Sequence, residues 1–314
     1  MSVEITPWQP SQFLSVLDLT PAELESCLAL AASLKAARRG QRPHDMPLTG
    51  RHVALLFDKP SLRTRSTFVI AVRELGGDVI EPPADVALAG RESIEDVARN
   101  LERWVFGTVV RTFAQERLER FAAAAPGLRV VNALTDEEHP CQALADCLTL
   151  FERWGSLRDR TVAFVGDGNN VAASLAQAVA MLGGTVVVAS PAGFELGEEI
   201  RDGVARVARF GGGVRVTNDP VEAVAQAHAV YTDVWASMGQ EGEAARRDAL
   251  FRPYQVNAAL MAQAPEDALF MHCLPAHRGD EVTDEVIDSA ASVVFDQSEN
   301  RLHTQKALLS LLAS

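Results

Sequence analysis

Positive charge is scarce in this chain of 314 residues. It carries 29 lysine and arginine residues against 42 aspartate and glutamate residues, which gives a formal net charge of −13. Nucleic acids and anionic membrane surfaces attract basic proteins, so this balance argues against either of them as the main partner. An anionic small ligand is still compatible with the charge, provided that cationic side chains gather locally at its site.

Cysteine is also rare, and long apolar runs are missing. The four cysteines form no Cys-x-x-Cys pair, which favours reduced thiols over a disulfide framework. No run of about 18 apolar residues occurs, so we expect no membrane span. The first 13 residues lack both the apolar core of a signal peptide and the character of a transit peptide. We therefore expect a cytoplasmic protein.

The remaining composition is that of an ordinary globular protein, with 47% hydrophobic and 23% charged residues. The length suffices for about two domains. Thr20-Pro21-Ala22-Glu23 has the pattern of a capping box and predicts a helix that runs to Arg38. Strands and helices then alternate. We expect strands at 53–57, 79–81, 108–111, 129–132, 161–166, 185–189, 214–217, 229–232 and 268–273, and further helices at 66–75, 93–104, 115–123, 140–154, 170–182, 195–209, 220–227 and 299–312.

This alternation predicts an α/β fold with two domains, each a parallel sheet between two layers of helices. We expect the first domain to comprise residues 1–157, joined by the last helix at about 299–314, and the second to comprise 158–298. In open parallel sheets, ligands bind at the carboxyl ends of the strands. The polar clusters of this sequence all lie at such ends.

The most informative cluster is Ser61-Leu62-Arg63-Thr64-Arg65, which lies between an apolar strand and an amphipathic helix. A helix start offers unpaired backbone N–H groups and the positive end of the helix dipole. Arg63 adds a planar fork that matches phosphate oxygens, and the two hydroxyls add further donors. The segment therefore predicts a phosphate site, although solvated charges at a helix start are an equally simple reading of the two arginines.

Two further clusters follow strands in the first half. Arg111 closes one strand, where it points into the crevice or remains a surface charge. In His139-Pro140-Cys141-Gln142, the proline suits the first position of a helix and places His139 at the N-cap. The histidine can donate a hydrogen bond to a carbonyl or phosphate oxygen. A zinc site would need more ligands than His139 and Cys141 provide.

In the second half, Gly166-Asp167-Gly168-Asn169-Asn170 resembles a dinucleotide-binding turn but lacks the third glycine of that fingerprint. This counts against a dinucleotide-dependent oxidoreductase. The two asparagines present amides at a helix start, where we assign Asn169 to helix capping. A later strand is followed by Asp233, an anion that can hold an ammonium group, and by Ser237.

The last cluster is His272-Cys273-Leu274-Pro275-Ala276, which ends the strand predicted at 268–273. A cysteine by itself is more often a buried small hydrophobe than a reactive thiol. Its place at a strand end, before a proline turn, favours a functional role.

Taken in order, these clusters and Glu299-Asn300-Arg301 resemble the aspartate/ornithine carbamoyltransferase superfamily over almost the whole chain. Asp233-x-x-x-Ser237-Met238-Gly239 and His272–Pro275 resemble the branch that uses ornithine. The resemblance implies an active site in the cleft between two domains and transfer of a carbamoyl group from carbamoyl phosphate to the δ-amine of L-ornithine. It also implies that no metal or organic cofactor is required, and it implies a homotrimer or a multiple of trimers.

The resemblance assigns roles residue by residue. The residues implied to bind carbamoyl phosphate are Ser61, Leu62, Arg63, Thr64, Arg111, His139, Gln142, Cys273, Leu274 and Arg301. Those implied to bind ornithine are Asn170, Asp233, Ser237 and Met238. The catalytic residues among them are Arg63, Arg111, His139, Asp233 and Cys273. Leu62 replaces the threonine most often found there, but the family uses the backbone N–H of that position.

Two other readings remain open. One is a carbamoyltransferase for another amine, such as N-acetylornithine or putrescine. The other is a non-catalytic member of the family, although such a protein would be expected to have lost its polar clusters.

Overall fold

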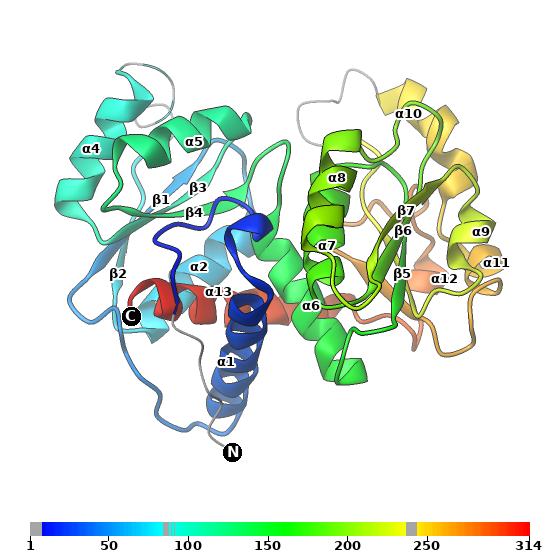
Figure 1. Ribbon diagram of the computed structural model, residues 1–314, viewed down its shortest axis with the longest axis horizontal. Coiled ribbons are helices and arrows are strands. Elements are labelled where there is room, and N and C mark those ends of the chain that lie inside the picture. Colours follow the sequence, from blue (N-terminus) through cyan, green and yellow to red (C-terminus); the bar gives the residue numbers. More distant parts are fainter. Residues whose placement is uncertain (1–7, 84–87, 89, 91, 237–243) are drawn as a thin grey trace. The chain divides into compact units, whose positions relative to one another are not determined.

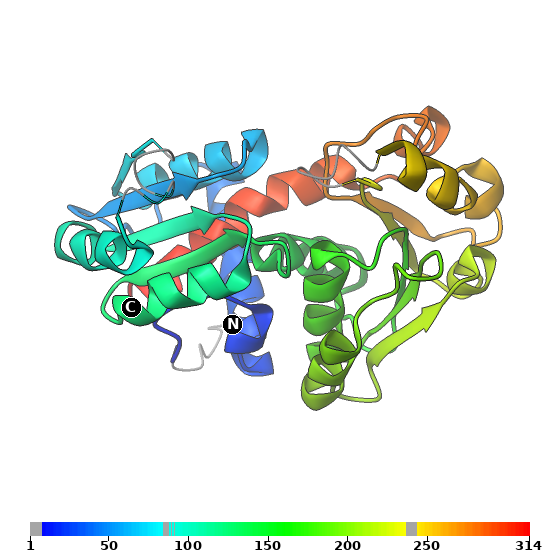
Figure 2. The same ribbon diagram turned by 90° about the horizontal axis from the view of Figure 1, so that it is seen from above.

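The computed structural model describes residues 8–83, 88, 90, 92–236 and 244–314. The chain forms two compact units, Met1–Leu148 with Glu299–Ser314 and Thr149–Ser298. Each unit contains one parallel sheet with helices on both faces (Figure 1 and Figure 2). The prediction of two α/β domains with parallel sheets is confirmed, whereas the domain limits 1–157 with 299–314 and 158–298 stay a prediction.

The sheet of the first unit has the strand order β2-β1-β3-β4. Its strands are β1 (His52–Phe57), β2 (Asp78–Ile80), β3 (Gly107–Arg111) and β4 (Arg129–Leu134), and all are paired in parallel. Its helices are η1 (Val16–Asp18), α1 (Pro21–Arg39), α2 (Leu62–Glu74), α4 (Ile94–Trp104), α5 (Gln115–Ala124), the start of α6 (Pro140–Trp154) and most of α13 (Val294–Leu312).

Alternation along β1 divides the first unit into layers. Ala54 and Leu56 belong to a buried cluster with the apolar faces of α4 and α5. Successive strand residues point to opposite faces, so the equally buried Val53 and Leu55 face the other side. On that side lie α2 and the C-terminal part of α13 (Figure 1).

The sheet of the second unit has the order β7-β6-β5-β8-β9, again all parallel. Its strands are β5 (Thr161–Val165), β6 (Thr185–Ala189), β7 (Gly213–Thr217), β8 (Ala229–Thr232) and β9 (Leu269–His272). Helices α7 (Asn170–Met181) and α8 (Glu198–Val207) lie on one face. The other face packs against α9 (Pro220–Val224), α11 (Ala258–Met261) and α12 (Asp284–Ile287), as Figure 1 shows.

Both sheets contain a point where the strand order reverses. In the first unit the chain passes outward from β1 to β2, then crosses to β3 and β4. In the second it passes from β5 outward to β6 and β7, then crosses to β8 and β9. Such switch points open a crevice at the carboxyl ends of the two central strands. They lie between β1 and β3 in one unit and between β5 and β8 in the other.

Several predicted helix limits are wrong, with the largest errors at the starts of two helices, and short helices went unrecognised. Helix α2 begins at Leu62 rather than at residue 66, because the Ser61 hydroxyl accepts from the backbone N–H of Thr64 and caps the helix there. Helix α13 begins at Val294, five residues before the predicted start. The sequence pattern also missed α10 (Ala244–Phe251), η3 (Arg252–Tyr254), α11 and α12. By contrast, the capping box of Thr20 and Glu23 is present as predicted.

None of the helices in the described part of the chain is both long enough and apolar enough to cross a membrane.

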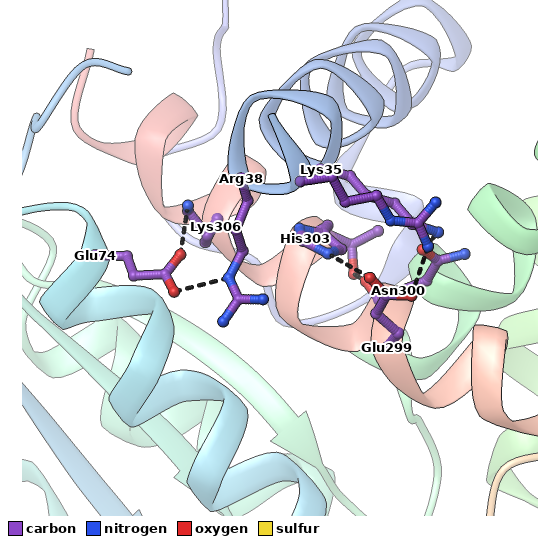
Figure 3. A network of polar contacts seen from close by, with 9 residues as sticks. Lys35, Arg38, Glu74, Glu299, Asn300, His303 and Lys306 are labelled. Carbon is purple, nitrogen blue, oxygen red and sulfur yellow. Dashed lines mark hydrogen bonds and ion pairs between the residues drawn. The ribbon is translucent and has the colours of Figure 1, made fainter. Parts of the chain in front are cut away.

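Helix α13 is tied to the first unit by buried polar contacts (Figure 3). The Lys306 ammonium, which is fully buried, donates to Glu74 Oε2 at 2.8 Å and lies 3.1 Å from His44 Nε2. Glu74 also accepts from Arg38 Nε at 2.9 Å. A buried cation requires such partners, because an unpaired charge in the interior is costly.

A second group of contacts lies one to two turns earlier on the same helix (Figure 3). Lys35 Nζ donates to Asn300 Oδ1 at 2.6 Å, and Arg39 Nη2 donates to Glu299 Oε2 at 2.9 Å. Glu299 Oε1 lies 3.4 Å from Nε2 of the buried His303. These contacts join α1 to the start of the part of α13 that belongs to the first unit.

We expect His303 to make the folded protein sensitive to acid. Burial, aided by the charges of Lys35 and Lys306 and opposed by Glu299, lowers the pKa of His303 from 6.5 to about 4. Unfolding therefore takes up a proton between these pH values, and stability falls as the pH drops through that window. In His303→Gln, urea titrations between pH 7 and pH 4.5 should show a shallower fall in unfolding free energy.

The exposed His277 provides the matched control, because His277→Gln should leave the slope of the wild-type protein unchanged. Identical slopes for wild type and His303→Gln would contradict the assignment.

Candidate functional site

The first candidate half-site lies at the switch point between β1 and β3. Ser61 caps α2, so Leu62, Arg63 and Thr64 form its first turn. The side chain of Leu62 is apolar and 76% exposed. The polar group that Leu62 contributes is therefore its backbone N–H. The start of an α-helix provides N–H donors and a positive dipole end, which together favour an anion.

Arg111 ends β3 opposite Phe57 of β1 and is 7% exposed. Its carbonyl accepts from the Asp58 N–H at 2.8 Å, and the pairing of β3 with β4 shifts register just before it. The reading of Arg111 as a surface charge is therefore wrong. The strand presents a buried guanidinium at the same sheet edge as the start of α2.

His139 occupies the entry to α6, where its carbonyl accepts from the N–H groups of Gln142 and Ala143. Burial lowers the pKa of His139 well below its ordinary value, and the charges of Arg301 and Arg111 lower it further. The imidazole is therefore neutral near pH 7. It can donate one hydrogen bond without adding a third positive charge to the two guanidiniums.

Arg301 of α13 joins two parts of this half-site. Its Nη2 donates to Thr64 Oγ1 at 2.8 Å, and its Nη1 donates to Gln142 Oε1. The Gln142 amide in turn donates to Asp146 Oδ1 at 2.7 Å. All four side chains are buried. This chain of contacts fixes which way the amide of Gln142 points, with its oxygen toward the arginine.

Sequence reasoning missed Lys59. Its ammonium is buried, donates to Asp136 Oδ1 at 2.6 Å and lies 4.2 Å from the centre of the Phe113 ring. Lys59 lies two positions after the end of β1. This position at a strand end is the feature of the sequence that indicates a site residue. Lys59 adds a paired cation to the same edge of the sheet.

The second candidate half-site lies at the switch point between β5 and β8. Asp233 follows β8 and is 7% exposed. Its Oδ2 accepts from Asn169 Nδ2 at 2.9 Å, and its Oδ1 accepts from the Cys273 thiol at 2.9 Å. Cys273 is therefore not simply a buried apolar residue, because it is half-buried and directed at a carboxylate.

The two asparagines after β5 differ in position. Asn169 caps α7, since its Oδ1 accepts from the N–H groups of Val171 and Ala172, as predicted. It also reaches Asp233, which the sequence did not indicate. Asn170 is the first residue of α7 and is half-buried. The predicted Ser237 and Met238 lie outside the described residues.

The turn after β9 is held by a buried pair. His272 Nδ1 accepts from the Leu274 N–H at 2.9 Å, and its Nε2 lies 3.1 Å from Glu281 Oε1. Glu281 Oε1 also accepts from the His277 N–H. Leu274 adopts a φ of 57°, which is uncommon for a side chain of this kind and persists only where the surroundings enforce it. The pair therefore fixes the backbone that carries Cys273.

Asp233, His272 and Cys273 are the one group of possible metal ligands among the described residues, with ligand atoms within 4.8 Å of one another. Their hydrogen bonds already use these atoms. The Nδ1 lone pair of His272 takes the Leu274 N–H, and the thiol proton is directed at Asp233. A metal ion would have to displace both contacts, so the donor set does not fit a resident ion.

The two half-sites have complementary character. The first combines a helix start with buried arginines, as expected for an anionic donor. The second combines a buried carboxylate with a thiol and amides, as expected for a cationic acceptor. Each half-site, taken by itself, therefore fits a small charged molecule, as in enzymes that act on two such substrates.

The family model of the carbamoyl-P binding domain of aspartate/ornithine carbamoyltransferase matches residues 11–152, and that of the Asp/Orn binding domain matches residues 158–312. The chain belongs to the aspartate/ornithine carbamoyltransferase family, whose members are carbamoyltransferases.

Curated relatives named ornithine carbamoyltransferase include proteins from Parafrankia sp. and Symbiobacterium thermophilum. They are 51% and 49% identical to this chain, covering 96% and 98% of it and 95% and 99% of their own lengths. Solved structures of ornithine carbamoyltransferases give the same picture. That from Pyrococcus furiosus has a TM-score of 0.92 at 47% identity, covering 96% of both chains. That from Thermus thermophilus has a TM-score of 0.87 at 42% identity, covering 98% of this chain and all of its own.

Proposed function

We propose that the protein transfers the carbamoyl group of carbamoyl phosphate to the δ-amine of L-ornithine, which yields L-citrulline and phosphate. The family and the names of its full-length relatives support this reaction. The observation that carries the choice of acceptor is the buried Asp233 beside Cys273. A carboxylate at this position attracts an amino group and repels an acidic acceptor such as aspartate.

The proposed donor site is the first half-site. The phosphate of carbamoyl phosphate binds to the start of α2 through Ser61, the Leu62 N–H, Arg63 and Thr64, with Arg111 beside it. This assignment is supported by the preference of helix N-termini and arginine forks for phosphate oxygens. The carbamoyl end binds His139 and Gln142, with Arg301 holding the amide of Gln142, and the family pattern adds Cys273 and Leu274.

The proposed chemistry needs stabilisation of negative charge. When the amine attacks the carbonyl carbon, that carbon becomes tetrahedral and its oxygen gains negative charge. Arg63, Thr64 and His139 donate hydrogen bonds to this oxygen, which lowers the barrier because donors oriented before the reaction need no reorganisation during it. Collapse of the intermediate breaks the bond to the phosphate oxygen, the attacking nitrogen gives up one proton to the departing phosphate, and Arg111 stabilises that phosphate.

The proposed acceptor site is the second half-site. Asp233 and Asn170 hold the α-amino-acid end of ornithine together with Ser237 and Met238. The δ-ammonium has a pKa of about 10.4 in solution, like that of lysine, and must lose a proton before it can attack. Asp233 and Cys273 orient the resulting amine. These groups suit a substrate that has an α-amino-acid end. Putrescine lacks that end and is therefore a poorer fit.

The setting of the reaction is also proposed. We infer a role in arginine biosynthesis in the cytoplasm, by a homotrimer or a multiple of trimers. A relative from Pyrococcus furiosus is named an anabolic ornithine carbamoyltransferase, which supports the biosynthetic direction. Light scattering of the purified protein would measure the number of subunits.

The proposed reaction is tested by supplying carbamoyl phosphate with L-ornithine, N-acetylornithine, putrescine or aspartate in parallel. We expect carbamoylation of ornithine alone, measured as citrulline. The rate should be unchanged after treatment with EDTA, since no metal is required. Turnover only with another amine would replace the acceptor. Folded protein that binds carbamoyl phosphate but carbamoylates none of the four would point to the non-catalytic reading.

Cys273→Ala should weaken the use of ornithine far more than the binding of carbamoyl phosphate. The substitution removes the thiol that contacts Asp233, whereas the helix start and the arginines of the first half-site keep their contacts. Steady-state kinetics with each substrate varied in turn would measure both effects. Unchanged kinetic constants for ornithine would contradict the role of Cys273.

His139→Ala should lower kcat by about 100-fold, which is typical for loss of one donor to a developing oxyanion. Because the pKa of His139 lies well below its ordinary value, the side chain is neutral near pH 7. The pH dependence of kcat/KM for ornithine should therefore have the same shape in the variant as in the wild type, rising with deprotonation of the amine. An acidic limb that disappears in the variant would refute a neutral His139.

A further inference from the structure

Arg247 of α10 is a buried cation that neither the family resemblance nor the proposed mechanism uses. Its Nη1 donates to Asp167 Oδ2 at 2.5 Å and to the Trp235 carbonyl at 2.8 Å. The guanidinium lies 4.9 Å from the centre of the Phe194 ring and 5.8 Å from that of Phe251. Only 7% of the residue is exposed. The side chain is therefore held on several sides, and its position is well defined.

Its partner Asp167 belongs to the turn that carries Asn169. The Asp167 carbonyl accepts from the Asn169 N–H at 2.7 Å. Between them, Gly168 packs so closely on residues 195–196 that a Cβ would lie 2.4 Å from the Leu196 nitrogen. The turn is thus fixed at Gly168 by packing and at Asp167 by Arg247. Asn169, on the same turn, donates to Asp233.

Two carboxylates at the switch point of the second sheet are consequently linked through Asn169, whose N–H donates to the Asp167 carbonyl and whose amide donates to Asp233. The pKa of Asp167 is raised by burial; the contact with Arg247 opposes this, and the charge of Asp233 adds to it. The negative charges of the two acids therefore repel each other. The carboxylate that Arg247 contacts is that of Asp167, while Asp233 contacts Asn169 and Cys273.

We propose that Arg247 is a positioning residue of the acceptor site: it neutralises and fixes Asp167, and so leaves Asp233 as the acid that binds the amino groups of the substrate. This inference rests on the proposed function. If Arg247 is removed, Asp167 becomes a second uncompensated charge beside Asp233, since a buried charge that loses its partner is strongly unfavourable. The turn then shifts, and Asn169 no longer orients Asp233.

The first test is Arg247→Met, which removes the charge but keeps much of the apolar stem. We expect kcat/KM for ornithine to fall by roughly 10- to 100-fold, as a misplacement of about 1 Å in an active site can cause. The KM for carbamoyl phosphate should not change. Arg153→Met is the matched control, because Arg153 pairs with Asp296 within the same unit at a half-exposed position and should leave kinetics unaltered.

The second test is the double variant Arg247→Met/Asp167→Asn. If Arg247 acts by neutralising Asp167, removing that charge as well should restore part of kcat/KM for ornithine relative to Arg247→Met alone. A purely structural role predicts no recovery, because the double variant lacks still more contacts. Equal effects of Arg247→Met on both substrates, or a double variant no better than the single one, would overturn the proposal.

Arg247→Lys covers the case in which Arg247→Met does not fold. Lysine retains the charge opposite Asp167, so it should keep a higher kcat/KM for ornithine than any neutral substitution at this position. The assay of the wild-type protein distinguishes failure of the proposed function from failure of the role of Arg247. Absence of citrulline from the wild type refutes the proposed function, whereas an active wild type with an ornithine constant unaffected by Arg247→Lys and Arg247→Met refutes only the role of Arg247.

Discussion

The constraint on which the structure depends is that both sheets are parallel and covered by helices on both faces. A strand in such a sheet carries mostly apolar side chains along its length, so its polar groups concentrate at its ends. At the reversal of strand order, two neighbouring carboxyl ends diverge and leave room for a ligand. Arg111 and the start of α2 lie at this point in the first unit, and Asp233 and Asn169 lie at it in the second.

Buried charges are paired with opposite charges in both units. Each buried cation described above has a partner, as Lys59 has Asp136, Lys306 has Glu74 and Arg247 has Asp167. His139 is kept neutral by burial and by two guanidiniums. Because charge without a partner is expensive in the interior, these pairings decide which groups are left to meet a substrate. In the second unit, the proposed role of the Arg247–Asp167 pair is to leave Asp233 for that purpose.

Much of this could be predicted from the sequence. The strands were found because they are short apolar runs between turn residues, and the cap of Thr20 because its pattern is local. The start of α2 was misplaced, because the weakly amphipathic first turn hides a helix that is set by the hydroxyl of Ser61. The short helices α10, α11 and α12 were missed, since four to eight residues carry too little periodicity to be recognised.

The sequence by itself determined the alternation of strands and helices, the clusters at strand ends and, through their order, the family. These are local features, and each can be read within a dozen residues. Only the tertiary structure decided which side chains meet. That Asn169 reaches Asp233, that Arg301 joins Thr64 to Gln142 and that Arg247 neutralises Asp167 depends on contacts between residues 64 to 237 positions apart. Such contacts follow from strand order and packing, which no local pattern encodes.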